Sequence, residues 1–102
     1  MAEEALLKIA DIELDRRRME VRRARKVIPL TPLEFKLLEY LIRNKNAVVT
    51  RQTLLTELWQ YSPDIQTRVV DVYIGYLRKK IDGHTSKKLI ASIRGYGYTI
   101  RE

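Results

Sequence analysis

The stretch that decides the fold of this 102-residue chain runs from Thr67 to Ile81 and reads TRVVDVYIGYLRKKI. Its apolar residues recur at the three- and four-residue spacing that is typical of one face of an α-helix. Asp82 and Gly83 follow as a stop signal, so we expect a helix from about Thr67 to Ile81. The side of this helix that we expect to face the core carries Val70, Ile74, Leu77 and Ile81.

The opposite side of the same helix has a different composition. At about 100° per residue, it gathers Arg68, Val72, Gly75, Tyr76 and Lys79. This set has few charges for a solvated face, and a β-branched residue, a glycine and an aromatic residue suit a surface that another molecule covers. The major groove of DNA is wide enough to admit one helix. The alternative is an ordinary surface helix with scattered exposed residues.

Two further helices are expected upstream. The segment Thr31-Pro32-Leu33-Glu34 forms a capping box, with proline at the first helical position. Thr50 is a candidate cap for the second helix, which ends near Trp59. Residues 60–66 include Pro63, which disfavours a helix, and we interpret them as a loop. The apolar stripe of the first helix consists of Phe35, Leu38, Leu41 and Ile42, and that of the second of Leu54, Leu55, Leu58 and Trp59.

Both ends of the chain show strand patterns. From Leu7 to Leu30, short alternating pairs are separated by polar turns, which predicts an antiparallel meander. Leu89–Ile93 and Tyr98–Ile100 flank the turn residues 94–97, which predicts a terminal β-hairpin. Residues 1–8 are interpreted as a linker or an added end, and residues 9–102 as the domain. The strand pairs are Ile12 and Leu14, Met19 and Val21, and Ile28 and Leu30.

Composition narrows the class of protein. The length fits one domain, and 45% hydrophobic residues are enough to form a core. No apolar run is long enough to span a bilayer, and the absence of cysteine excludes disulfides and is compatible with the cytoplasm. The formal net charge of +7 attracts polyanions. Because the chain lacks a glycine-rich phosphate loop and a convincing nucleophile–base pair, we expect no catalytic residues, no metal and no cofactor.

Several motifs in order resemble one family. They are Leu30–Phe35 (LTPLEF), Val49–Arg51 (VTR), Leu58–Trp59 (LW), Arg68–Ile74 (RVVDVYI), Leu77–Lys80 (LRKK) and Ile93–Tyr98 (IRGYGY). Over roughly residues 9–101 the chain is similar to the C-terminal effector domains of OmpR/PhoB-type bacterial response regulators. The resemblance implies an α+β winged helix-turn-helix with an N-terminal four-stranded antiparallel sheet, three helices and a C-terminal β-hairpin wing.

The resemblance also implies functional residues. It implies sequence-specific binding of double-stranded DNA, with the third helix in the major groove and the wing residue Arg94 in the minor groove. The residues that it places near bases are Val69, Asp71, Val72, Tyr76 and Arg94. Those near phosphates are Arg51, Trp59, Arg68, Tyr73, Arg78, Ser92 and Tyr98, and we add Lys79 from its place on the outer face. Local pairing of Asp71 with Arg68 is an equally plausible role for that carboxylate.

The partners that the resemblance implies are those of a two-component system. They include direct DNA repeats bound by head-to-tail dimers of a domain that is monomeric alone, an attached receiver domain, and a sensor histidine kinase. A loop that matches the segment able to contact RNA polymerase consists of Gln60, Tyr61, Ser62, Pro63, Asp64, Ile65 and Gln66. No receiver domain is present, so we expect an excised fragment or a regulator without one. Gly75 and Tyr76 stand where some relatives carry arginines, so the base preference of those relatives cannot be transferred.

Seven basic residues lie between Arg16 and Lys26, the densest positive charge in the chain. The resemblance places them on the N-terminal sheet, away from the helix and wing. We therefore interpret them as a solvated hairpin edge, where charge discourages aggregation between strands. Neutralising Arg22, Arg23 and Arg25 should then leave DNA affinity nearly unchanged. The main alternative function for the whole domain is a winged-helix module for protein–protein contact.

Overall fold

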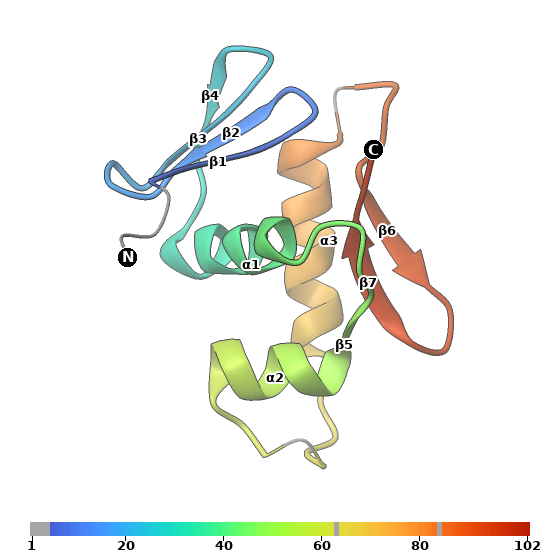
Figure 1. Cartoon of the computed structure of the whole chain (residues 1–102). Coiled ribbons are helices and arrows are strands. Elements are labelled where there is room, and N and C mark those ends of the chain that lie inside the picture. The colour runs from blue at the N-terminus through green and yellow to red at the C-terminus, as the bar shows by residue number, and fades with distance from the viewer. Residues whose placement is uncertain (1–4, 63, 84) are drawn as a thin grey trace.

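The computed structural model describes residues 5–62, 64–83 and 85–102 (Figure 1). The elements in chain order are β1 (Leu6–Ile9), β2 (Ile12–Asp15), β3 (Glu20–Arg23), β4 (Lys26–Ile28), α1 (Pro32–Arg43), β5 (Val49–Thr50), α2 (Arg51–Trp59), α3 (Val69–Ile81), β6 (Ile90–Ile93) and β7 (Gly97–Ile100). The predicted α+β order, with an antiparallel sheet, three helices and a terminal hairpin, is confirmed. In the described part of the chain, none of the helices combines the length and the apolar character that crossing a membrane requires.

The N-terminal sheet has the strand order β1-β2-β3-β4, and every pair is antiparallel. Leu14 lies opposite Val21, and both are buried on the face that the sheet turns toward α1. The sheet begins at Leu6, so residues 6–8 form part of β1 and not of the linker interpreted from the sequence. Met19 has a positive φ of 54° and lies in the turn before β3 rather than in the predicted strand.

The capping box of α1 is present as predicted. The Thr31 hydroxyl accepts from the Glu34 amide at 3.3 Å, and the Glu34 carboxylate accepts from the Thr31 amide at 2.9 Å. The same carboxylate is buried and receives Lys80 Nζ of α3 at 2.7 Å. Burial opposes ionisation, but the hydrogen bonds from Lys80 and Thr31 outweigh it, so the pKa of Glu34 lies below its ordinary value. This residue therefore starts α1 and also ties it to α3.

The N-terminal ends of α2 and α3 differ in how they are capped. Thr50 caps α2 by accepting from the Thr53 amide at 3.1 Å. The third helix begins at Val69, two residues later than predicted. Its N-cap residue, Arg68, makes no side-chain cap hydrogen bond, and the Val69 amide donates to the Thr67 hydroxyl at 3.2 Å. Among the described residues between α2 and α3 none is helical, as expected, and Pro63 lies outside the described residues.

The C-terminal sheet has one strand more than the predicted hairpin. Its order is β5-β7-β6, with Val49 opposite Tyr98 and Thr50 opposite Gly97. The strand β5 (Val49–Thr50) was not predicted from the sequence. A Cβ atom at Gly97 would lie 2.1 Å from the Val49 carbonyl oxygen, so only glycine permits this close approach. β5 is the link that attaches the hairpin to the start of α2.

The predicted core stripe of α3 is confirmed. Val70, Ile74, Leu77 and Ile81 are all almost fully buried. In Figure 1, α3 stands between α1 on one side and the β6–β7 hairpin on the other. The stripe therefore sits in one hydrophobic core that also includes buried residues of α1, α2 and both sheets.

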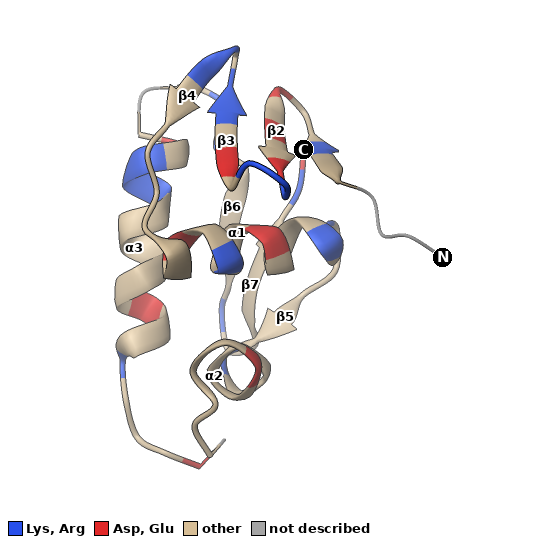
Figure 2. Cartoon of the chain, turned by 90° about the vertical axis from the view of Figure 1, so that its left-hand side faces the viewer, with Lys and Arg blue, Asp and Glu red and all other residues tan. Residues whose placement is uncertain are grey.

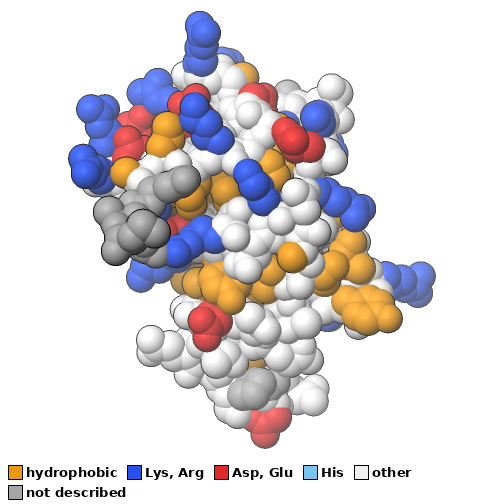
Figure 3. Space-filling model, viewed as in Figure 1, with side chains coloured by type: hydrophobic (Ala, Val, Ile, Leu, Met, Phe, Trp, Pro, Cys, Tyr) orange, Lys and Arg blue, Asp and Glu red, His pale blue; other side chains and the backbone are white. Residues whose placement is uncertain are grey.

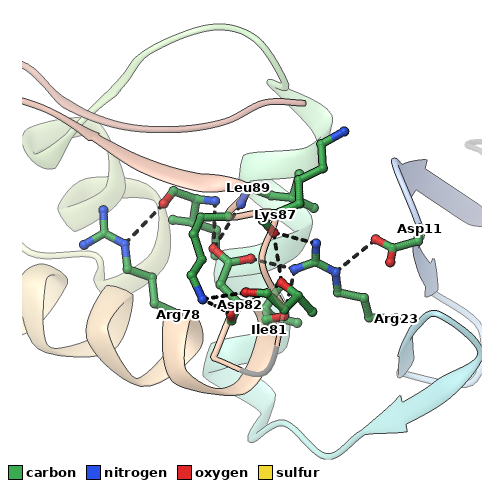
Figure 4. Close-up of polar contacts among 10 residues, drawn as sticks. Asp11, Arg23, Arg78, Ile81, Asp82, Lys87 and Leu89 are labelled. Carbon is green, nitrogen blue, oxygen red and sulfur yellow. Dashed lines mark hydrogen bonds and ion pairs between the residues drawn. The ribbon is translucent and has the colours of Figure 1, made fainter.

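Arg23 on β3 is a buried clamp rather than part of a solvated edge (Figure 4). Its Nη1 donates to the Ile81 carbonyl at 2.9 Å and to Asp82 Oδ1 at 2.7 Å. Its Nη2 donates to the Lys87 carbonyl at 2.8 Å, and its Nε donates to Asp11 at 2.9 Å. The interpretation of Arg23 as a solvated residue is wrong, because strand alternation turns it inward beside Val21. The affinity test of the basic cluster therefore applies to Arg22 and Arg25 alone.

The Asp82 carboxylate completes the clamp on its other oxygen. Its Oδ2 accepts from the Leu89 amide at 3.1 Å and from the Ile90 amide at 3.0 Å. These amides lead into β6, so one buried carboxylate joins β3, the end of α3 and the start of the hairpin.

Replacement of Arg23 by alanine would leave Asp82 buried without its cation. We expect the free energy of unfolding to fall by about 3–5 kcal/mol, measured by urea denaturation. The matched control is Arg22→Ala, which removes an exposed arginine from the same strand and should change stability by no more than about 0.5 kcal/mol. Equal effects of the two substitutions would contradict the proposed clamp.

Candidate nucleic-acid interface

The outer face of α3 is open to solvent. Val72 is 43% exposed and Tyr76 is 50% exposed, while Gly75 and Lys79 are exposed between and beyond them. A Cβ atom built at Gly75 would meet no atom within 4 Å. The terminal hairpin packs beside α3 and not over this face, so the predicted division of the helix into a buried and an exposed face is confirmed.

Positive charge on α3 is concentrated at the ends of the helix (Figure 2). Arg68 precedes the first turn and is exposed, and the last turn carries Arg78, Lys79 and Lys80. Cations in the last turn also stabilise the helix through its dipole. In contrast to the basic last turn, the first turn carries an acidic residue, Asp71.

Aromatic rings connect α2 to the outer face of α3. The Trp59 and Tyr73 ring centroids are 5.4 Å apart at 74°, and those of Tyr73 and Tyr76 are 5.5 Å apart at 65°. Both are edge-to-face contacts, which favour a defined ring orientation. Trp59 and Tyr73 are half-buried, so Tyr76 is the exposed end of a row of three aromatic rings that contact one another in sequence.

Asp71 joins α2, α3 and β7. Its Oδ1 accepts from Arg51 Nε at 2.8 Å and from the Tyr98 hydroxyl. Arg68 contributes electrostatic attraction to this carboxylate, but its direct partners come from the two other elements. Burial alone would raise the pKa of Asp71, but the bonds from Tyr98 and Arg51 outweigh it and lower the pKa. The pKa of Tyr98 is raised by burial and by its bond to Asp71.

A second guanidinium group lies on the other side of Tyr98. Arg78 Nη2 donates to the Ser92 hydroxyl at 2.5 Å, and its Nε donates to the Ile90 carbonyl at 3.3 Å. The guanidinium carbons of Arg51 and Arg78 lie 5.7 Å and 5.6 Å from the Tyr98 ring centroid. Four residues predicted near phosphates are thus brought together with Asp71, namely Arg51, Arg78, Ser92 and Tyr98. We call these five residues the seam cluster.

The turn of the hairpin presents two exposed side chains. Arg94 is exposed, and Gly95 has a positive φ of 83° that suits glycine. Tyr96 is 69% exposed. The sequence predicts Tyr96 only as a turn residue. A large aromatic residue between two glycines in a turn has no core to enter, and that signal could have identified it as a possible contact.

The loop between α2 and α3 lies at the end of the molecule opposite the N-terminal sheet (Figure 1). Tyr61 and Ile65 are exposed large apolar residues in this loop, and the Ser62 hydroxyl is hydrogen-bonded to Asp64. Gln60 and Gln66 are exposed as well. This segment therefore presents a mixed apolar and acidic surface that is separate from the outer face of α3.

The densest basic charge lies over the N-terminal sheet. In the view of Figure 3, Lys and Arg side chains gather over the upper part of the molecule and are sparse over the lower part around α2. Some of this charge is paired within the protein, since Arg16 Nε lies 2.6 Å from Glu39 and Arg22 Nε lies 2.7 Å from Glu20. Charge density alone therefore points to the N-terminal sheet and not to the outer face of α3.

Comparison with known proteins gives consistent matches. The family model described as "Transcriptional regulatory protein, C terminal" matches residues 24–100. The uncharacterized transcriptional regulatory protein YkoG of Bacillus subtilis is 44% identical over 91 residues, which cover 89% of this chain and 40% of that protein. The chain spans 40–44% of the length of the curated relatives that it matches first.

Solved structures are similar over nearly the whole chain. The response regulator DrrB of Thermotoga maritima, an OmpR/PhoB homolog, has a TM-score of 0.85 and 32% identity, covering 98% of this chain and 46% of that one. The DNA-binding domain of the response regulator AdeR, solved in complex with an intercistronic region, has a TM-score of 0.80 and 26% identity, covering 93% and 97%. These likenesses confirm the winged-helix fold.

The seam cluster should make the free energy of unfolding decrease as the pH becomes acidic. The pKa of Asp71 is below its ordinary value of 3.8, so its contribution to stability is present above about pH 3.8 and is lost as the pH falls through the folded-state pKa. We expect Asp71→Asn to be less stable than wild type at neutral pH and to lose less stability on acidification. Thermal unfolding across a pH series measures both effects. Arg51→Ala should reduce the acid dependence in the same direction, and an unchanged dependence in both variants would contradict this role of Asp71.

Proposed function

Because the chain belongs to the family of C-terminal domains of OmpR/PhoB-type transcriptional regulatory proteins, we propose that it binds double-stranded DNA in a sequence-specific manner as the output domain of a two-component regulator. The observation that carries the proposal is the open outer face of α3, whose opposite side is buried in the core. The intercistronic region bound to the similar AdeR domain supports the same class of ligand.

In the proposed complex, α3 enters the major groove and the hairpin turn reaches the minor groove. Val72 and Tyr76 lie on the exposed face and contact base edges, with Val69 and Asp71 close by in the first turn. Arg94 enters the minor groove, where the negative potential is enhanced when the groove is narrow. Exposure of Val72, Tyr76 and Arg94 supports these roles.

The phosphate contacts surround this face. We assign them to Arg51, Trp59, Arg68, Tyr73, Arg78, Lys79, Ser92 and Tyr98. Four of these residues are held by contacts within the seam cluster before any ligand is bound. Side chains that are already ordered lose less conformational entropy on binding. Phosphate contacts of this kind fix the register of a protein on the duplex, while base contacts provide specificity.

The remaining partners follow from the family. The whole protein, which in its relatives is more than twice as long as this chain, would act in the cytoplasm, where a receiver domain receives the signal of a sensor histidine kinase. The domain, monomeric alone, would bind direct repeats as a head-to-tail dimer. The exposed Tyr61 and Ile65 support a contact between the α2–α3 loop and RNA polymerase. The part of that call that concerns Pro63 lies outside the described residues.

Val72→Glu tests the proposed function. A carboxylate at the centre of the outer face of α3 would repel DNA, so binding to a duplex selected from a random pool should be lost. The thermal unfolding midpoint should stay near that of wild type. The matched control is Val27→Glu, because Val27 is 52% exposed on β4 and the change in net charge is the same. The control should bind nearly as wild type, with an affinity that falls steeply with salt. Equal binding by both variants, or a shallow salt dependence, would favour the protein–protein module instead.

Arg94→Ala tests the role of the hairpin turn. We expect weaker binding, with the largest loss for duplexes whose flanks form narrow A·T minor grooves, because the arginine gains most from the potential there. Titrations of one core site with A·T-rich and G·C-rich flanks measure the difference. A loss of equal size for every flank would argue against minor-groove insertion.

A further inference from the structure

The length of α3 sets which of its residues can face base edges. Arg68 and Lys79 are eleven positions apart, which corresponds to roughly 16 Å at the rise of a helix. The major groove is about 12 Å wide. A helix placed across such a groove would therefore hold its two charged ends over the phosphate backbones, and its centre would lie over the bases.

The centre of the outer face contains few hydrogen-bonding groups. It consists of Val72, Gly75 and Tyr76, and the phenol hydroxyl is the one side-chain polar group among them. Direct readout of guanine commonly uses arginine or lysine, and readout of adenine uses asparagine or glutamine. None of these residue types is present at these three positions. The exposed apolar surface of Val72 and Tyr76 suits a methyl group instead.

The guanidinium groups of α2 and α3 are hydrogen-bonded within the protein and do not serve the centre of the outer face. Arg51 is bonded to Asp71, and Arg78 is bonded to the Ile90 carbonyl and to Ser92. Both belong to the seam cluster. For either to read a base at the centre of α3, it would have to give up charge-assisted or backbone hydrogen bonds that the fold already makes.

No contact within the protein requires a glycine at position 75. Glycine within a helix is destabilising relative to alanine. A Cβ atom at this position would meet nothing within 4 Å, so packing does not require its absence. A missing side chain on the exposed face does allow the helix backbone to approach a ligand closely. That approach brings the side chains on either side of Gly75 deeper into a groove.

We propose that α3 recognises thymine 5-methyl groups, with Val72 and Tyr76 as the residues that contact them, so that the centre of the half-site is rich in A·T pairs. This proposal rests on the proposed function, because it names the class of duplex that the same face binds. Thymine is the one base that presents a methyl group in the major groove. Side chains four positions apart on a helix lie about 5–6 Å from each other, close enough to contact methyl groups of neighbouring base pairs.

The test replaces single thymines by deoxyuridine, which removes the 5-methyl group and leaves the hydrogen-bonding pattern unchanged. The probe is a duplex recovered by selection from a random pool, and affinity is measured by fluorescence anisotropy with the full chain. We expect a roughly three- to fivefold loss at one or more central positions, from the transfer free energy of one methyl group. Other thymines should show no effect.

Protein variants assign the methyl contacts to their residues. Val72→Ala or Tyr76→Ala should abolish the uracil effect at one central position each, and thermal unfolding checks that both variants remain folded. The matched control is Lys79→Ala, which should weaken binding to all duplexes and keep the full uracil effect. Persistence of every uracil effect in both Val72→Ala and Tyr76→Ala would overturn the assignment.

The outcomes separate this proposal from the proposed function. Selected duplexes with guanine-rich centres, or a duplex in which every thymine tolerates uracil, would overturn methyl recognition and leave DNA binding intact. Failure to recover any duplex would overturn both.

Discussion

Arg23 lies only 4% exposed between the N-terminal sheet, the end of α3 and the loop that leads to β6. A guanidinium group removed from water is tolerated only when its donors are satisfied, and here Ile81, Asp82, Lys87 and Asp11 satisfy them. These partners fix where α3 ends relative to both sheets. Together with the buried apolar stripe, they determine which side of α3 remains exposed.

The N-terminal end of α3 is fixed by a second carboxylate. Asp71 holds Arg51 of α2 and Tyr98 of β7, so the elements beside the outer face of α3 are connected through one residue. A face whose surroundings are already ordered can bind a ligand at a lower entropic cost than a set of independent loops. Hydrogen bonds within the protein also hold the guanidinium groups of Arg51 and Arg78.

The densest positive charge of the domain and the outer face of α3 lie on different surfaces. The formal net charge of +7 provides long-range attraction for a polyanion. Much of the visible positive charge lies over the N-terminal sheet, where part of it is paired with Glu20 and Glu39. In the proposed function, specificity belongs to α3, which is singled out by the exposure and chemistry of its outer face rather than by charge density.

Features that depend on neighbouring residues could be predicted from the amino-acid sequence, because periodicity and capping act within a few positions. These features are the capping box at Thr31, the inward and outward faces of α3, and the hairpin at the C-terminus. Other features depend on contacts between distant elements and could not be predicted in this way. They are the roles of Arg23 and Asp71, the short strand β5 and the place of residues 6–8 in β1. Arg23 meets partners 58, 59 and 64 positions away, and Asp71 meets partners 20 and 27 positions away. Such contacts depend on how helices and sheets pack, which no local pattern of side chains records.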